Sequence, residues 1–418
     1  MAQGSYAVLI DWNGDGTFTG TTEDVTARTL EASWSRGRDF ASQLAGRSIS
    51  GQLSLELNNQ SGDYSPFNIA SPLYGSLLPG RKIQVKGGTG TANNILWTGY
   101  IQYIEPAPEN FGLNRVVITG LGPLGYLNQL EAIVGMLTNQ TTGSAFGTLL
   151  DRVGWGTARS IDPGKSVLLT FWNENKKVLD AMREIEETEA GFVAEGKDAS
   201  IIFEDRHHRL VEPYLTSQAT FTDATGGTLV YVDIKQEDPL RYITNVFEAP
   251  VKTYSSGSLT VLWQFSGTGT NSRIIRGGGE LVLWTQYPNS ASPTNAIGVS
   301  LWIDPASGTD YTANSNPSGT GGVDLTSSVV VTTAPYGNSM EITLVNNANQ
   351  DAYLGKLQAR GYPLQVADLV SVKVIDSTSS SLYGTRSYQS QSDFIPDTEE
   401  ALDWARQNLA IYSEPGQS

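Results

Sequence analysis

The sequence predicts a mainly β protein with one small α/β module near its middle. Three observations predict this fold class. Alternating apolar and polar residues recur in short segments along most of the 418 residues. Glycine is abundant, with 44 residues, and pairs such as Asn58-Asn59 and Pro79-Gly80 separate the segments as turn signals. Helical periodicity is confined to residues 140–215 and to the C-terminal residues.

The first 130 residues are typical of a series of strands joined by tight turns. The clearest alternation lies in residues 49–57 and places five residues on one face: Ile49, Gly51, Leu53, Leu55 and Leu57. Other strands are predicted over residues 6–10, 83–85, 96–101 and 115–118. Strands at this spacing indicate a small barrel or sandwich.

Residues 140–215 predict the α/β module. One helix is expected to begin at a cap residue, Ser144, and to end at Gly154. A second helix is expected to begin after Asn173 or Asn175 and to end at Gly191. Its apolar stripe comprises Val178, Met182 and Ile185, and its other face is charged. A strand over residues 199–204 completes the module.

The remaining sequence returns to strands. Residues 228–232 and 243–247 predict two of them, and residues 369–375 a third. Between these, residues 256–360 predict an inserted immunoglobulin-like sandwich with polar loops. A final helix is expected from a capping box of Asp397 and Glu400. Its buried face comprises Ala401, Trp404, Ala405 and Leu409.

Charge and composition exclude several classes of function. The net charge of −16 argues against binding to a phosphate backbone and would repel DNA. The chain has no cysteine, which excludes disulfides, thiolate nucleophiles and cysteine-based metal sites. No signal peptide or membrane-spanning apolar run is expected, so folding in a cytoplasm is predicted.

A short motif at residues 11–16, DWNGDG, resembles the beginning of a calcium loop of the EF-hand type. The twelfth position holds Thr22 in place of glutamate, and strands flank the motif, so a true EF-hand is excluded. A looser Ca²⁺ site would use four residues: Asp11, Asn13, Asp15 and Asp24. The alternative is a tight turn in which these carboxylates accept backbone N–H groups.

No catalytic signature is found, and we expect no enzyme. The two histidines, His207 and His208, are adjacent at a predicted hairpin tip, which favours a structural role over chelation. Nucleophile elbows and phosphate-binding loops are absent. Four aromatic residues are predicted to belong to the sandwich core, with sugar stacking as the alternative: Trp263, Trp284, Tyr287 and Trp302.

The order of short motifs resembles the tail-tip hub, or minor tail protein, family of siphophages. In the N-terminal part the motifs cover residues 11–16, 23–26, 36–39, 55–59, 63–68, 71–75, 78–81 and 97–101. Further along they cover residues 178–191, 203–206, 310–314, 324–326 and 357–361. The resemblance therefore spans nearly the whole chain.

This resemblance implies a fold of two tube-like β-barrels plus an inserted β-sandwich. The first barrel would cover residues 1–130 and the α/β module residues 131–220. The second barrel would combine residues 221–255 and 361–418, with the C-terminal helix, around the sandwich of residues 256–360. Three such chains would form a pseudo-sixfold ring.

The function implied is that of a virion structural protein at the phage tail tip, assembled in the host cytoplasm. A homotrimer would join the hexameric tail tube to a threefold tip and close the channel before DNA ejection. Its partners would be tail tube, distal tail, tape-measure and tip or fibre proteins, without specific nucleic-acid binding and without a membrane segment. The alternatives are a distal tail ring protein or a phage carbohydrate-binding or carbohydrate-degrading protein.

Overall fold

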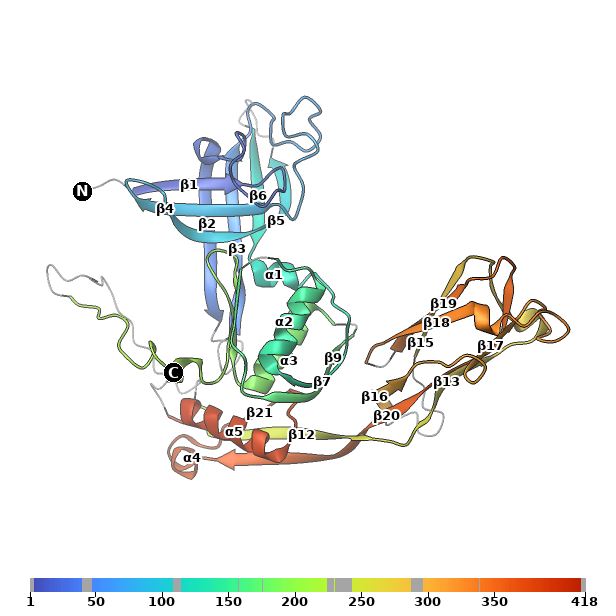
Figure 1. Cartoon of the computed structure of the whole chain (residues 1–418). Coiled ribbons are helices and arrows are strands. Elements are labelled where there is room, and N and C mark those ends of the chain that lie inside the picture. Colours follow the sequence, from blue (N-terminus) through green and yellow to red (C-terminus); the bar gives the residue numbers. More distant parts are fainter. Residues whose placement is uncertain are drawn as a thin grey trace.

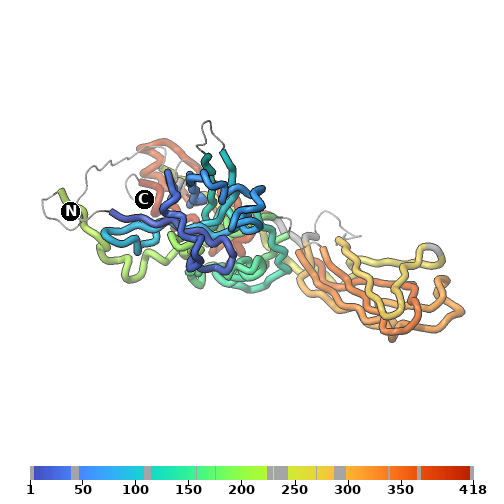
Figure 2. Tube along the Cα trace, turned by 90° about the horizontal axis from the view of Figure 1, so that it is seen from above, coloured from blue at the N-terminus to red at the C-terminus, as the bar shows by residue number. Residues whose placement is uncertain are grey.

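The computed structural model describes residues 4–39, 47–107, 114–156, 158–174, 176–223, 229, 243–286, 296–337 and 339–414. The chain is mainly β, as predicted. Figure 1 shows three parts: a curled sheet, a body with most of the helices beneath it, and a sandwich that projects to one side. Figure 2, turned by 90°, shows the same projection of the sandwich away from the rest.

The first sheet has six antiparallel strands in the order β1-β4-β5-β6-β3-β2. In chain order they are β1 (Gly4–Ile10), β2 (Thr29–Asp39), β3 (Arg47–Asn58), β4 (Lys82–Thr89), β5 (Asn94–Ala107) and β6 (Arg115–Leu121). Among the described residues the order is linear, with β1 and β2 at its edges, so the sheet is a curled half-barrel (Figure 1). Closure into a tube stays a prediction.

The alternation in β3 is confirmed except at its first position. Leu53, Leu55 and Leu57 are at most 1% exposed and pack in the core of this sheet. Ile49 was expected beside them but is 44% exposed. It lies where β3 leaves this core for the α/β module, whose Arg183 donates to the carbonyl of Ser48.

The α/β module packs its helices against short strands around one core. Its elements are α1 (Pro123–Leu127), β7 (Val134–Thr141), α2 (Thr142–Arg152), β8 (Arg159–Ile161), β9 (Val167–Asn173), α3 (Val178–Glu189), β10 (Phe192–Glu195) and β11 (Ile201–Glu204). β7 pairs with β9, and β11 lies between β10 and β8. Val178, Met182 and Ile185 are buried as predicted.

The predicted caps of the two module helices are wrong. Thr141 caps α2 by accepting the N–H of Ser144, because β7 leads directly into the helix one turn earlier than expected. Lys177 holds the cap position of α3, whereas Asn173 ends β9 and donates its side-chain amide to Ala132. Asn175 lies outside the described residues. The left-handed residue that ends α3 is Ala190, with φ 51°, directly before Gly191.

The lower sheet is built on two long strands, β12 (Val246–Ser256) and β20 (Ala352–Ile375). β21 (Ser387–Gln389) adds to β12 in parallel, and α5 (Thr398–Tyr412) covers the sheet beside α4 (Ser377–Tyr383). Asp397 caps α5 as predicted, accepting the N–H of Glu400 at 2.8 Å. Most of the expected strand 228–232 lies outside the described residues, and the second barrel stays a prediction.

The sandwich has two sheets around a separate core. One contains β15 (Glu280–Gln286), β18 (Val329–Pro335) and β19 (Ser339–Asn346). The other is the first half of β20 with β13 (Thr260–Ser266), β14 (Arg273–Ile275), β16 (Ala296–Ile303) and β17 (Tyr311–Asn314). We call this projecting unit the arm.

Helices long and apolar enough to cross a membrane are absent from the described part of the chain.

Candidate functional site

The loop after β1 is organised by the carboxylate of Asp11. Its two oxygens accept the backbone N–H groups of Gly14, Asp15 and Gly16 at 2.7, 3.1 and 2.8 Å. Gly14 and Gly16 have φ of 76° and 84°, in the left-handed region that glycine adopts without strain. The sequence therefore folds locally into a tight turn around the buried carboxylate of Asp11.

A backbone bridge brings a second segment to this turn. Leu9 bridges Asp24, and the N–H of Ile10 donates to the carbonyl of Glu23 at 2.8 Å. Successive side chains of a paired segment point to opposite sides. Glu23 consequently points inward and is 1% exposed, whereas Asp24 is exposed and caps the N–H of Thr26 at 3.0 Å.

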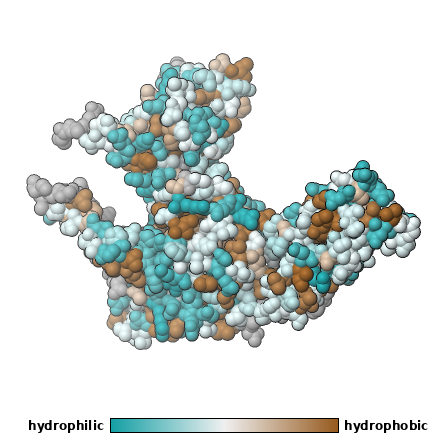
Figure 3. Space-filling model, in the orientation of Figure 1, coloured by the Kyte–Doolittle hydropathy of each residue, from teal (hydrophilic) through white to brown (hydrophobic). Residues whose placement is uncertain are grey.

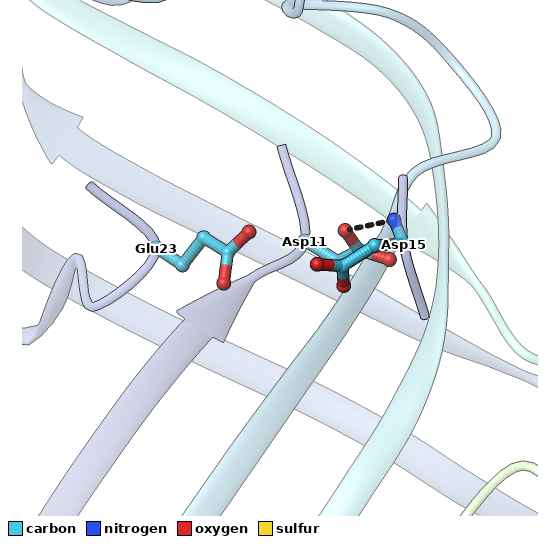
Figure 4. A group of neighbouring side chains, drawn as sticks. All are labelled: Asp11, Asp15 and Glu23. Atoms are coloured by element: carbon cyan, nitrogen blue, oxygen red, sulfur yellow. Dashed lines mark hydrogen bonds between the residues drawn. The ribbon is translucent and has the colours of Figure 1, made fainter. Parts of the chain in front are cut away.

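Three carboxylates meet in the loop, from Asp11, Asp15 and Glu23 (Figure 4). One oxygen of each lies within 4.8 Å of the others. Glu23 accepts the N–H of Gly20 through Oε2, while its buried Oε1 has no hydrogen-bond partner. Hydrogen bonds from Thr17 hold the pKa of the exposed Asp15 carboxyl below its ordinary value. Oxygen ligands in this arrangement suit a hard cation.

The predicted residues are thus brought together only in part. Asp11 and Asp15 meet, but Asp24 faces away and Glu23 holds the place expected for it. Asn13 is exposed, and its amide braces Asp15 through Nδ2 at 3.0 Å and Oδ1 at 2.9 Å. The two-residue alternation after Thr22 was the sequence signal that could have identified Glu23.

The two histidines lie apart from this loop. His208 contacts Asp162 through Nδ1 at 2.7 Å and packs against Tyr214, while the N–H of His207 donates to Asp205. Among the described residues, no group of three potential metal ligands includes either histidine. This geometry agrees with a structural role at the turn after β11.

Helix α3 carries a row of buried acidic side chains that connects the parts of the body. Glu186 pairs with Arg183 and Arg47, and Glu189 with Arg206. The same Arg206 pairs with Glu400 of α5. Arg183, on the face predicted as charged, also contacts the first sheet by donating to the carbonyl of Ser48. Such ion pairs tie the elements together because removing one partner leaves a buried charge.

Glu187 extends this connection to the lower sheet. Its side chain accepts the hydroxyl of Tyr388 in β21 at 3.0 Å, and its carbonyl accepts the indole N–H of Trp404 in α5 at 2.7 Å. Burial raises the pKa of the Glu187 carboxyl. Helix α3 is consequently the common support of the module, the lower sheet and α5.

The arm is carried by one continuous strand. The 24 residues of β20 pair with β12 in the body and with β13, β14, β16 and β17 in the arm. At about 3.3 Å per residue the strand spans roughly 80 Å. Since strand pairing continues from body to arm, the connection is a ribbon and not a loose linker.

A second contact holds the base of the arm against the module. Trp172 of β9 lies against Gly337, where an added Cβ would be 2.1 Å from the indole Cδ1. Nearby, Ser339 donates to the carboxylate of Glu174. The arm is therefore fixed at two places: the β20 ribbon and this contact of Gly337 and Ser339 with the module. We call this contact the arm joint.

The aromatic residues of the arm differ in exposure. Trp263 and Trp302 pack partly buried against the sandwich core, as predicted. Trp284 is 56% exposed and stacks on Tyr336, with ring centroids 5.4 Å apart, so its assignment to the core is wrong. Tyr287 lies outside the described residues. On the face in Figure 3, apolar residues are scattered over the arm in small groups.

Comparisons with solved structures find tail proteins and a component of a type VI secretion system. A tail protein from Neisseria meningitidis is 11% identical, with a TM-score of 0.38 over 59% of this chain and 64% of that chain. A 43 kDa tail protein of prophage MuSo2 from Shewanella oneidensis is 13% identical, with a TM-score of 0.31 over 48% and 54%. The chain thus spans less than two thirds of either tail protein.

A third solved structure is an E. coli component of the type VI secretion system, described as structurally similar to T4 bacteriophage tail proteins. It is 10% identical, with a TM-score of 0.32 over 81% of this chain and 76% of that chain. No protein-family model and no curated protein sequence matches the chain.

Proposed function

We propose that this chain is a structural hub subunit at the tip of a siphophage tail. The observation that carries the proposal is that one body, the α/β module with the lower sheet, bears both the first sheet and the arm. A curled sheet with edge strands β1 and β2 stands on the module, and the arm projects from the body on the unbroken strand β20. Within the described residues, the segment at residues 23–24 covers only the end of β1 near Leu9. The order of short motifs in the sequence supports the same assignment.

The edges of the first sheet support assembly into a ring. Trp34 in β2 lies opposite Leu53 and so belongs to the core face, yet it is 41% exposed, and Leu30 in the same strand is 53% exposed. Tyr6 in the other edge strand is 57% exposed. Uncovered edge strands invite pairing with another chain. A ring needs two different edges, each meeting the other on the next copy.

In this proposal three copies form the ring, and a second barrel in each chain gives pseudo-sixfold symmetry. The ring joins the tail tube to the tip, seats the tape-measure protein and contacts distal tail and fibre proteins. The chain has no catalytic role. Its net charge of −16 keeps DNA from adhering as it passes through the ring.

Native mass spectrometry and electron microscopy of the full chain test the ring. We expect trimers, and we expect Leu30→Glu to convert them to folded monomers, because this side chain is already half exposed within one chain. Leu301→Glu is the matched control, since Leu301 is 60% exposed but lies on the arm. A monomeric wild type that binds no tail component would refute the proposal, and a sixfold ring would identify a distal tail ring protein instead.

A further inference from the structure

The acidic loop after β1 lacks the counter-charge that its burial requires. Asp11 and Glu23 are 2% and 1% exposed, and within the described residues neither forms an ion pair with Lys, Arg or His. Arg81 packs on Gly14 of the turn, yet it forms no ion pair with these carboxylates, and its Nε has no hydrogen-bond partner. Buried carboxylates are stable when they are paired or coordinate a metal.

One carboxylate oxygen of this acidic cluster has no hydrogen-bond partner. Oε1 of Glu23 is buried and has no hydrogen-bond partner, while the rest of its carboxylate is fixed by the N–H of Gly20. In Figure 4 the carboxylate faces Asp11 and Asp15. A buried acceptor without a donor is expensive, so the position favours a cation that accepts its lone pair.

The spacing of the oxygens fits calcium. Ca²⁺ holds oxygen ligands at about 2.3–2.6 Å, so it accommodates oxygens up to roughly 4.8 Å apart on opposite sides. The three oxygens lie within 4.8 Å of one another. Mg²⁺ demands near-ideal octahedral geometry at about 2.0–2.1 Å and gives up its water reluctantly, so a loop of three protein carboxylates favours Ca²⁺.

The geometry points to a Ca²⁺ site formed by Asp11, Asp15 and Glu23. The bound ion would hold the loop of residues 11–23 against the end of the first sheet. Asp24 and Asn13 are not ligands: Asp24 faces solvent, and Asn13 holds Asp15 in position. Water completes the coordination on the exposed side, next to Asp15.

The site is tested on the full chain by calorimetric titration with CaCl₂ after treatment with EDTA, and by thermal unfolding with and without calcium. We expect one bound ion and a rise in melting temperature of at least about 2 °C, since an ion that binds only the folded state stabilises it. MgCl₂ at the same concentration should give a smaller rise. An equal rise would contradict the preference for calcium.

Two neighbouring substitutions separate a ligand from a structural role. Glu23→Gln keeps an acceptor for the N–H of Gly20 but loses the negative charge, so it should abolish the calcium response without lowering the melting temperature of the calcium-free protein. Asp24→Asn should keep the full calcium response. Equal destabilisation by Glu23→Gln with and without calcium, or a wild type that releases no heat with CaCl₂, would overturn the site. These measurements need no ring assembly and so do not depend on the proposed function.

Discussion

Glu195, at the end of β10, connects the α/β module to the first sheet. Its carboxylate is 6% exposed and accepts the N–H of Gly51 in β3 at 2.6 Å and that of Leu124 in α1 at 3.1 Å. A Cβ on Gly51 or Gly122 would lie 2.4 or 2.3 Å from Oε1, so only glycine leaves room for this carboxylate. Glu195 thus joins the first sheet to the module, beside the contacts of Arg183 with Ser48 and of Arg47 with Glu186.

Because its carboxyl is buried, Glu195 should make the free energy of unfolding depend on pH. Burial raises the pKa of its carboxyl above the ordinary value, despite the lowering effect of the two N–H groups. The folded state then binds the proton more tightly than the unfolded state. The resulting stability is present below the ordinary pKa and is lost as the pH rises through the raised pKa. Urea unfolding across this pH range should show wild type losing stability relative to Glu195→Gln.

A second variant supports this prediction, and one result would contradict it. Glu195→Ala leaves two buried N–H groups without an acceptor and should cost about 1–3 kcal/mol. Parallel pH profiles for wild type and Glu195→Gln would show that the Glu195 pKa is the same in the folded and unfolded states.

Sequence proximity decided which site residues could be predicted. Asp11 and Asp15 lie four residues apart in one turn, so their meeting followed from the motif. Glu195 and Gly51 are 144 residues apart, and no local pattern relates them. Glu23 is an intermediate case, because its orientation follows from alternation but its pairing with β1 follows only from the fold.

At the scale of elements, the two glycines of α2 predict opposite effects of one substitution. A Cβ on Gly147 meets no atom within 4 Å, and its φ is not positive. Gly147→Ala should therefore stabilise the protein by about 0.5–1 kcal/mol through helix propensity. A Cβ on Gly143 would lie 2.0 Å from the carbonyl oxygen of Asp162, so Gly143→Ala should destabilise it. Chemical denaturation of both variants beside wild type measures the difference, and equal effects would contradict it.

Helices were predicted well where an apolar stripe specifies them, and poorly where neighbouring elements set their ends. The stripe of α3 is buried as expected, and so is that of α5 except for Leu409, which is partly buried. Thr141 replaces Ser144 as the cap of α2 because β7 continues into the helix. One face of α3 was predicted to be charged, and the contact of its Glu187 with Tyr388 of β21 follows only from the packing of the fold.

At the scale of the whole molecule, β20 is the feature that sequence patterns concealed. Its 24 residues include Gly355, Gly361 and Pro363, which are typical signals of strand ends. The predicted boundary between sandwich and second barrel falls at residues 360 and 361, inside this strand. Pro363 is tolerated beside a register shift of β16 between Val299 and Leu301, where regular pairing is already interrupted.

The arm joint predicts how the orientation of the arm is maintained. The β20 ribbon joins the arm to the body, and the contact of Gly337 with Trp172 opposes bending of that ribbon toward the module. Gly337→Val places new atoms against the indole and should cost about 1–3 kcal/mol at this contact, which the arm avoids by moving away. Small-angle scattering should then show a larger radius of gyration, and hydrogen exchange should increase in β7 and β9. Gly355→Ala is the control, since its Cβ would meet only Thr312, with the hydroxyl at 3.2 Å and the carbonyl oxygen at 3.8 Å. An unchanged scattering curve for Gly337→Val would mean that β20 alone sets the orientation of the arm.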